Sequence, residues 1–145
     1  MNNLKTIDNL KIVLANSYTL YLKTHNYHWN VTGPSFKSLH DLFELQYTEL
    51  AIAVDDIAER IRSLGSKAPG SFKEFLELAT LNEAKPNISA EEMLEDMVES
   101  QTTLLTSIKE ALKEAQNAED EVTIGFLGER LAVHEKARWM LESSK

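Results

Sequence analysis

The sequence predicts an all-α protein built as a four-helix bundle, with a short extra helix in the connection between the second and third long helices. Apolar residues recur at intervals of three and four over long stretches, which is the period of a helix and not that of a strand. Only 5 glycines and 3 prolines interrupt the 145 residues, and all of them except Gly125 and Gly128 fall between four long segments. Each segment has roughly 25 residues and would be near 40 Å long, which is the length of a bundle helix.

The first helix is predicted from Leu4 to about Asn30, where Thr32-Gly33-Pro34 breaks the apolar period. The second is predicted from Phe36 to Leu64 and ends at a glycine. The connection that follows contains an amphipathic stretch from Ser71 to Ala79, which we expect to be a helix too short to be stable alone. This long connection then serves as a crossover between the two halves of the bundle.

The third helix begins at a capping box, in which Ser89 is followed three residues later by Glu92, and it extends towards residue 117. An acidic pair at 120–121 lies where negative charge favours a helix start, and the fourth helix is predicted from Val122 to Leu141. No segment has the alternating pattern of a strand. We expect residues 1–145 to form a single domain.

Composition and charge indicate cationic partners. The formal net charge is −8 and the pI is near 5.0, which disfavours a whole-surface attraction to phosphate backbones. The absence of cysteine excludes thiolate zinc sites, iron–sulfur clusters and disulfides, and leaves nitrogen and oxygen ligands. The N-terminus has no secretory pattern and no apolar run approaches the ~20 residues that span a bilayer, so we expect a cytoplasmic protein without a membrane anchor.

Four potential metal ligands lie on one side of the second helix. His40 and Glu44 are four residues apart, as are Asp55 and Glu59, so each pair occupies neighbouring turns. At 100° per residue all four positions fall within one sector of the helix surface. Glu44 and Asp55 are nevertheless ~16 Å apart along the axis, too far to be bridged by ions whose ligand bonds measure ~2.0 to 2.2 Å. One chain cannot close a site from both pairs.

A second copy of the chain solves this problem. If the same helix of a partner lies antiparallel, His40 faces the partner's Glu59 and Glu44 faces the partner's Asp55, because both pairs of numbers sum to 99. His28, near the end of the first helix, can be folded back beside His40 by the intervening turn. Taken singly, each acid is more simply a solvated charge, but the joint pattern favours ligation. The sequence therefore predicts two shared metal sites in a twofold dimer.

The segment YHWNVTGPSFKSLHDLFELQYTELAIAVDDIAERI, from Tyr27 to Ile61, resembles the iron-binding signature of Dps proteins, the ferritin-like miniferritins of bacteria and archaea. The resemblance covers nearly the whole chain, including the short helix and HEKARWML near the C-terminus. The intrachain di-iron site of other ferritin-like bundles is not expected, because no histidine has a glutamate three residues before it. By resemblance, the ferroxidase ligands are His28, His40 and Glu44 of one subunit and Asp55 and Glu59 of its mate.

The resemblance implies an oxidoreductase that oxidises Fe(II) with hydrogen peroxide or oxygen at a di-iron centre shared between two subunits. It further implies storage of Fe(III) mineral in a hollow dodecamer and protection of DNA and cell from oxidative stress. Carboxylates and neutral imidazoles suit Fe(II), and two ferrous ions together can reduce peroxide without releasing a hydroxyl radical. Trp29, adjacent to His28, is expected either to donate an electron to a radical or to be an aromatic anchor at the dimer interface.

Two positions depart from the family pattern. Glu44 stands where aspartate is usual and reaches one methylene further, so the second iron position is expected to be occupied differently. Gly125 stands where an acid often lines the threefold pore, and iron entry is then expected to rely on Asp120, Glu121 or Glu129. Asp41 is either a mineral nucleation site or a solvated acid.

Two other classes of function stay open: a nucleoid-associated DNA-binding protein with secondary iron chemistry, and a purely structural helical assembly. We do not expect direct binding of DNA through a lysine-rich tail, because only Lys5 and Lys11 lie near the N-terminus. Binding bridged by divalent cations stays open. His25 and His134 lack paired carboxylates and are expected to be hydrogen-bonded structural residues, and Trp139 is expected to be a packing or interface residue.

Overall fold

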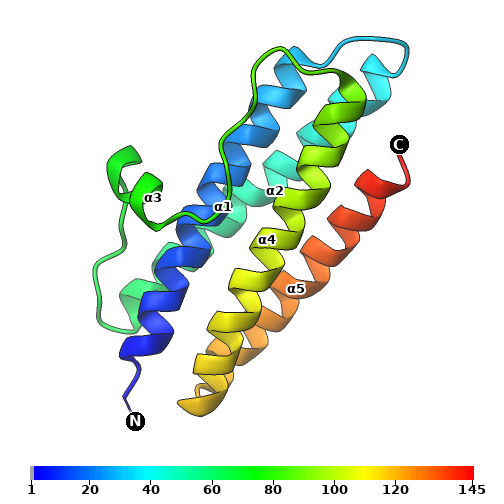
Figure 1. Ribbon diagram of the computed structural model, residues 1–145. Helices are drawn as coiled ribbons and strands as arrows, with labels where there is room; N and C mark the ends of the chain where they lie inside the picture. Colours follow the sequence, from blue (N-terminus) through cyan, green and yellow to red (C-terminus); the bar gives the residue numbers. More distant parts are fainter. Residues whose placement is uncertain (1) are drawn as a thin grey trace.

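The computed structural model describes residues 2–145, and within that range every regular element is an α-helix. Figure 1 shows four long helices packed side by side and one short helix outside the bundle, beside the first. The elements in chain order are α1 (Leu4–Asn30), α2 (Phe36–Ser63), α3 (Phe72–Leu78), α4 (Ala90–Asn117) and α5 (Glu121–Glu142). The predicted all-α four-helix bundle with a short extra helix is confirmed.

Loop length sets the order of the helices in space. α1 and α2 form an antiparallel pair because only five residues join them, among them Gly33, whose φ of 108° lies in the left-handed region that glycine adopts without strain. α4 and α5 form a second pair across a shorter turn of three residues. The segment between α2 and α4 instead runs back along the bundle and carries α3 (Figure 1). The residues that close α1 onto α2 are therefore the ones that bring His28 next to His40.

The core is apolar and draws on all four long helices. Phe43 is fully buried, and in α4 Met93 is 4% exposed and Met97 is fully buried. Tyr18 and Tyr21 have the spacing of core residues on α1 but are only half-buried at the edge of the core. Trp139 is 63% exposed, so it does not pack inside the subunit.

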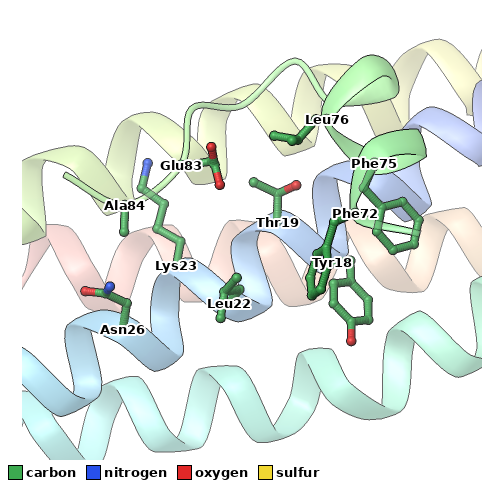
Figure 2. Close-up of a pocket in the computed structure, with 10 residues that line it drawn as sticks. All are labelled: Tyr18, Thr19, Leu22, Lys23, Asn26, Phe72, Phe75, Leu76, Glu83 and Ala84. Carbon is green, nitrogen blue, oxygen red and sulfur yellow. The ribbon is translucent and has the colours of Figure 1, made fainter. Parts of the chain in front are cut away.

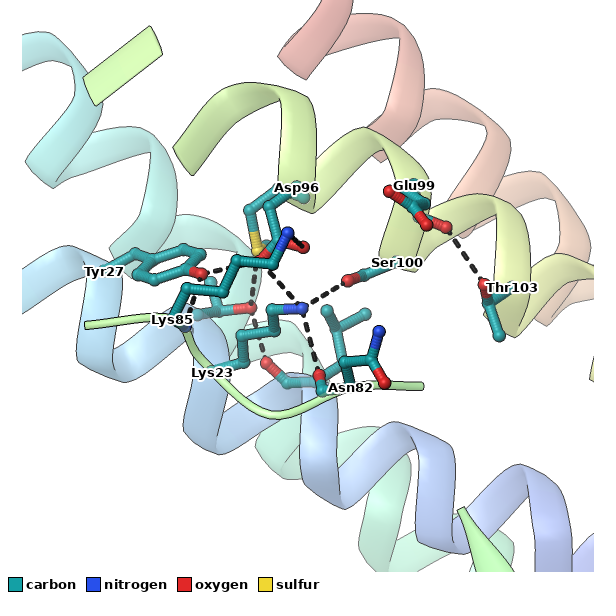
Figure 3. A network of polar contacts seen from close by, with 11 residues as sticks. Lys23, Tyr27, Asn82, Lys85, Asp96, Glu99, Ser100 and Thr103 are labelled. Carbon is teal, nitrogen blue, oxygen red and sulfur yellow. Dashed lines mark hydrogen bonds and ion pairs between the residues drawn. The ribbon is translucent and has the colours of Figure 1, made fainter. Parts of the chain in front are cut away.

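A buried polar network ties the crossover segment to α1 and α4 (Figure 3). The Lys23 ammonium lies 2.8 Å from Asp96 Oδ2 and donates to Ser100 Oγ and to the carbonyl oxygen of Asn82. The Tyr27 hydroxyl donates to Asp96 Oδ2 over 2.6 Å. Burial, followed by this hydrogen bond, raises the pKa of Tyr27. The Lys23 ammonium and the Asp96 carboxylate neutralise each other and are both hydrogen-bonded. The network can therefore hold residues 82–85 in place without leaving a buried charge unpaired.

Helix caps account for the boundaries. Ser89 and Glu92 form the predicted capping box at the start of α4. Asp120 caps α5 by accepting from the Thr123 backbone N–H over 3.1 Å, and it also pairs with Arg60 over 3.0 Å. Asp120 is thus occupied by its own subunit, and of the three acids expected at an iron entrance only Glu121 and Glu129 are exposed. Among residues 2–145, no helix combines the length and the apolarity needed to cross a bilayer.

Candidate metal centre

His28 and His40 are held face to face by reciprocal hydrogen bonds. Their ring centroids are 3.7 Å apart and the planes differ by 14°. Each Nδ1 lies 2.7 Å from the backbone carbonyl oxygen of the other histidine. Because a carbonyl oxygen only accepts, each Nδ1 must carry the proton, which leaves the lone pair on Nε2. Both imidazoles are therefore fixed in the tautomer that ligates a metal through Nε2.

Glu44 completes the first group of ligands. Its Oε1 lies 3.8 Å from His28 Nε2, and its side chain is 57% exposed, whereas His28 is 7% exposed. His28, His40 and Glu44 each offer one ligand atom, and these atoms lie within 4.8 Å of one another. Two imidazole nitrogens and one carboxylate form an open set, because Fe(II) takes more than three ligands and would have positions left for other groups.

The second group lies further along α2 and is wholly exposed. Asp55 and Glu59, one turn apart, lie with Asp56 so that one carboxylate oxygen of each falls within 4.8 Å of the others. Sequence reasoning missed Asp56, because a search for i,i+4 pairs selects residues 55 and 59 and passes over the adjacent acid. The structure thus brings His28 to His40 and Glu44, and Asp55 to Glu59, but it keeps these two groups separate within one subunit.

Between the two groups, α2 presents an uncharged surface to solvent. Leu45 is 61% exposed and Ile52 is 65% exposed, while the small side chains of Thr48 and Ala51 are exposed between them. Phe72 of α3 is also largely exposed. Monomeric soluble proteins rarely expose several large apolar side chains together, so such a surface marks an interaction site. This surface, Leu45, Thr48, Ala51, Ile52 and Phe72, is called the α2 face below.

His25, one of the two histidines outside the ligand groups, is held by stacking. The His25 ring lies 3.9 Å from the Trp29 ring and 4.2 Å from the Tyr47 ring, between centroids. Its expected hydrogen bond is not seen among the described residues; aromatic contacts take its place. Burial, and then the neighbouring His28, lowers the pKa of His25. Trp29 is itself 57% exposed beside His28, a position compatible with both roles expected for it.

His134 is the hydrogen-bonded structural histidine that the sequence predicted. Its Nδ1 donates to Gln101 Oε1 and its Nε2 accepts from Arg130 Nη2, each over 2.8 Å. Arg130 in turn pairs with Glu49. Burial, followed by the Arg130 charge, lowers the pKa of His134 to about 3. Asp41 pairs with Lys37 over 3.0 Å at the surface and belongs to neither ligand group.

Comparison with known proteins places this chain in a family. Residues 7–144 match the model of the ferritin-like domain. "DNA protection during starvation protein 2" of Bacillus anthracis is 38% identical over 141 residues, which is 97% of each chain. The crystal structure of Dps from Staphylococcus aureus superposes with a TM-score of 0.95 at 35% identity, over 99% of this chain and 96% of that one. The chain belongs to the Dps family.

A further Dps structure, from Vibrio cholerae O1, is described as a member of a broad superfamily of ferritin-like diiron-carboxylate proteins. It is 32% identical to this chain with a TM-score of 0.91, over 96% of this chain and 87% of that one. This Dps protein thus belongs to the ferritin-like superfamily, and its own nitrogen and carboxylate groups on α1 and α2 are of the type that binds iron.

Proposed function

We propose that this Dps protein is a ferroxidase whose active sites are shared across a twofold dimer and whose product is stored as Fe(III) mineral in a hollow dodecamer. Each site takes His28, His40 and Glu44 from one subunit and Asp55 and Glu59 from the partner. The observation that carries the proposal is the division of the ligands into two incomplete groups, one formed by His28 of α1 with His40 and Glu44 of α2 and the other further along α2, with an exposed apolar face between them.

The register of the dimer follows from the numbering. Two antiparallel α2 helices with residue numbers summing to 99 align His40 with the partner's Glu59 and Glu44 with the partner's Asp55. The same sum pairs Thr48 with the partner's Ala51, next to the axis. Both side chains are small and exposed, so two helices can approach closely there. The α2 face is then buried by association, which accounts for its exposed apolar residues.

The arrangement supports oxidation of Fe(II) as substrate. His28 and His40 offer their Nε2 atoms to the iron, because their Nδ1 atoms are engaged by backbone carbonyl oxygens. The carboxylates supply negative charge, which stabilises Fe(III) more than Fe(II) and so favours the oxidised product. With hydrogen peroxide, two Fe(II), one peroxide and two protons become two Fe(III) and two waters. Both electrons then come from iron and no hydroxyl radical is released.

Iron loading of paired variants tests the proposal. Anaerobic protein receives Fe(II) and then peroxide, and Fe(III) absorbance and a soluble mineral are followed. We expect His40→Ala combined with Asp55→Ala to lose rapid oxidation. Asp8→Ala, which removes an exposed acid of α1 outside both ligand groups, is the control and should keep the parent rate. Parent-like oxidation by the double variant would refute the site.

DNA protection by binding is the second candidate, because the relative from Bacillus anthracis is named for DNA protection. The net charge of −8 argues against a direct electrostatic contact, so binding bridged by divalent cations is the form that we favour. A gel-shift titration with duplex DNA, with and without Mg²⁺, tests this. A tight, salt-sensitive complex in the absence of Mg²⁺ would show direct binding instead.

A further inference from the structure

Aromatic side chains form a continuous line that starts at the first ligand group. The His28 ring meets the Tyr47 ring edge to face, with centroids 5.2 Å apart. Tyr47 meets Tyr21 over 6.0 Å, and Tyr21 meets Tyr18 over 5.7 Å, again edge to face. These are ordinary aromatic contact distances, so each ring touches the next. Three of the four tyrosines in the chain belong to this line.

The line ends at a groove that the second ligand group of the same subunit also borders. A groove of about 500 Å³ between α1, α2 and α3 is lined by both Tyr18 and Asp55. On its other side Tyr18 stacks with Phe75 of α3, with centroids 5.0 Å apart. Figure 2 shows Tyr18 projecting from α1 next to the phenylalanines of α3, with its hydroxyl directed away from the crossover segment. Tyr18 therefore contacts α3 on one side and lines, on the other, the groove that Asp55 also lines.

Helix geometry explains how the line arises. Tyr18, Tyr21, His25 and His28 follow one another at intervals of three and four along α1, which places them on one stripe. α2 runs antiparallel, so Tyr47 comes to lie opposite Tyr21, as His40 lies opposite His28. Neighbouring core positions of α1 carry leucine and valine, which fill space equally well. Packing alone does not require three phenols at the half-buried edge of the core.

We infer that Tyr47, Tyr21 and Tyr18 are an electron relay that connects the two ferroxidase sites of one dimer. The inference rests on the proposed function. In the twofold dimer His28 belongs to one complete site, whereas Asp55 of the same subunit belongs to the other. The tyrosines therefore join two sites that share no ligand, and each dimer has two such relays by symmetry.

The relay lets one electron come from each site. When each site holds a single Fe(II), the iron beside the peroxide supplies one electron and a tyrosine supplies the second, releasing its phenol proton to water at the half-buried hydroxyl. The Fe(II) of the sister site then reduces the tyrosyl radical through the relay, and the phenol takes a proton back from water. In sum, two Fe(II), one peroxide and two protons give two Fe(III) and two waters. Scarce iron is thus oxidised without a hydroxyl radical.

Substitution of the middle tyrosine tests the relay. Tyr21→Phe keeps the ring and removes the oxidisable phenol, whereas Tyr21→Trp restores an oxidisable ring. The assembled protein is loaded anaerobically with one Fe(II) per site or with two, and is then mixed with peroxide. At one Fe(II) per site we expect the parent and Tyr21→Trp to oxidise two Fe(II) per peroxide. Tyr21→Phe should be slower by on the order of tenfold or more and should give a hydroxyl-radical spin adduct.

Full loading separates failure of the relay from failure of the site. With two Fe(II) per site both electrons come from the same site, so Tyr21→Phe and Tyr18→Phe should match the parent. Parent-like behaviour of both variants at one Fe(II) per site, without a spin adduct, would overturn the relay. Equal losses at both loadings in both variants would also overturn it and assign these rings to packing. Absence of iron oxidation by the parent would instead refute the proposed ferroxidase.

Discussion

Replacing Ala51 by glutamate disrupts the proposed twofold contact without changing a metal ligand. Ala51 is exposed in the subunit, so the free energy of folding of one subunit should change by less than about 0.5 kcal/mol. In the proposed dimer the same position faces the partner's Thr48 at the axis. Ala51→Glu would therefore bury one carboxylate per subunit, without a counter-ion on the α2 face.

The size of the effect follows from the cost of burying charge. Each buried ion costs several kcal/mol, so a dimer that contains two of them should lose on the order of 6 kcal/mol of association free energy. At about 1.4 kcal/mol per factor of ten, the dimer is weakened by roughly four orders of magnitude. Repulsion from the acidic groups at either end of the face adds to this loss.

Sedimentation velocity, circular dichroism and peroxide-driven iron oxidation together measure the outcome. Ala51→Glu should retain its helical content, fall apart into smaller species and lose ferroxidase activity. Ala51→Ser keeps the side chain small and serves as the matched control, with assembly and activity like the parent. If Ala51→Glu assembled and oxidised iron as the parent does, the register that sums to 99 would be refuted.

Three further predictions concern groups around the site. Asp96→Asn leaves the buried Lys23 ammonium without its counter-ion and should destabilise the subunit by about 3–5 kcal/mol. The loss should be measured as a lower midpoint of urea unfolding. An unchanged midpoint would contradict a stabilising role of the Lys23–Asp96 network. The pKa of His134 is about 3 in the folded protein and near 6.5 in the unfolded chain, so unfolding takes up a proton at intermediate pH. The contribution of His134 to the free energy of unfolding is therefore fully present above pH 6.5 and is lost as the pH falls towards about 3. This loss amounts to up to about 5 kcal/mol per subunit, and His134→Gln should flatten the dependence of the urea midpoint on pH across that interval. If Trp29 donates electrons, Trp29→Phe should leave the oligomer intact and increase oxidation of the protein by peroxide. If Trp29 is instead an anchor at the dimer interface, the same substitution should dissociate the oligomer.

Helix positions were predictable because local signals determine them. Capping residues and glycines limited the error at helix ends to about one residue: α2 ends at Ser63, for example, because Leu64 is already the C-cap. The pairing of His28 with His40 also followed from the turn between them. The reciprocal hydrogen bonds from each Nδ1 to the other residue's backbone carbonyl oxygen could not be predicted, because they depend on the side-chain torsions and on how closely the two helices approach.

Contacts between residues distant in sequence escaped prediction. Lys23 and Asp96 are 73 positions apart, and nothing periodic relates them. The available signal was a lysine at an apolar position, between Leu20 and Tyr27 on the buried stripe of α1. The sequence suggests Asp120 as an acid at an iron entrance. In the structure Asp120 instead caps α5 and accepts a hydrogen bond from Arg60, and this bond depends on where α2 ends relative to α5. The tyrosine line likewise requires two helices to be placed together.

Mixing two inactive variants measures the central claim most directly. His28→Ala/His40→Ala lacks one half of every site and Asp55→Ala/Glu59→Ala lacks the other, so each alone should fail to oxidise Fe(II). When the two are coexpressed, a mixed dimer has one complete site and one that retains only Glu44. Random pairing should then restore roughly a quarter of the parent's sites and a matching share of its activity. Mixed oligomers that remain as inactive as either parent variant would contradict a site shared between subunits.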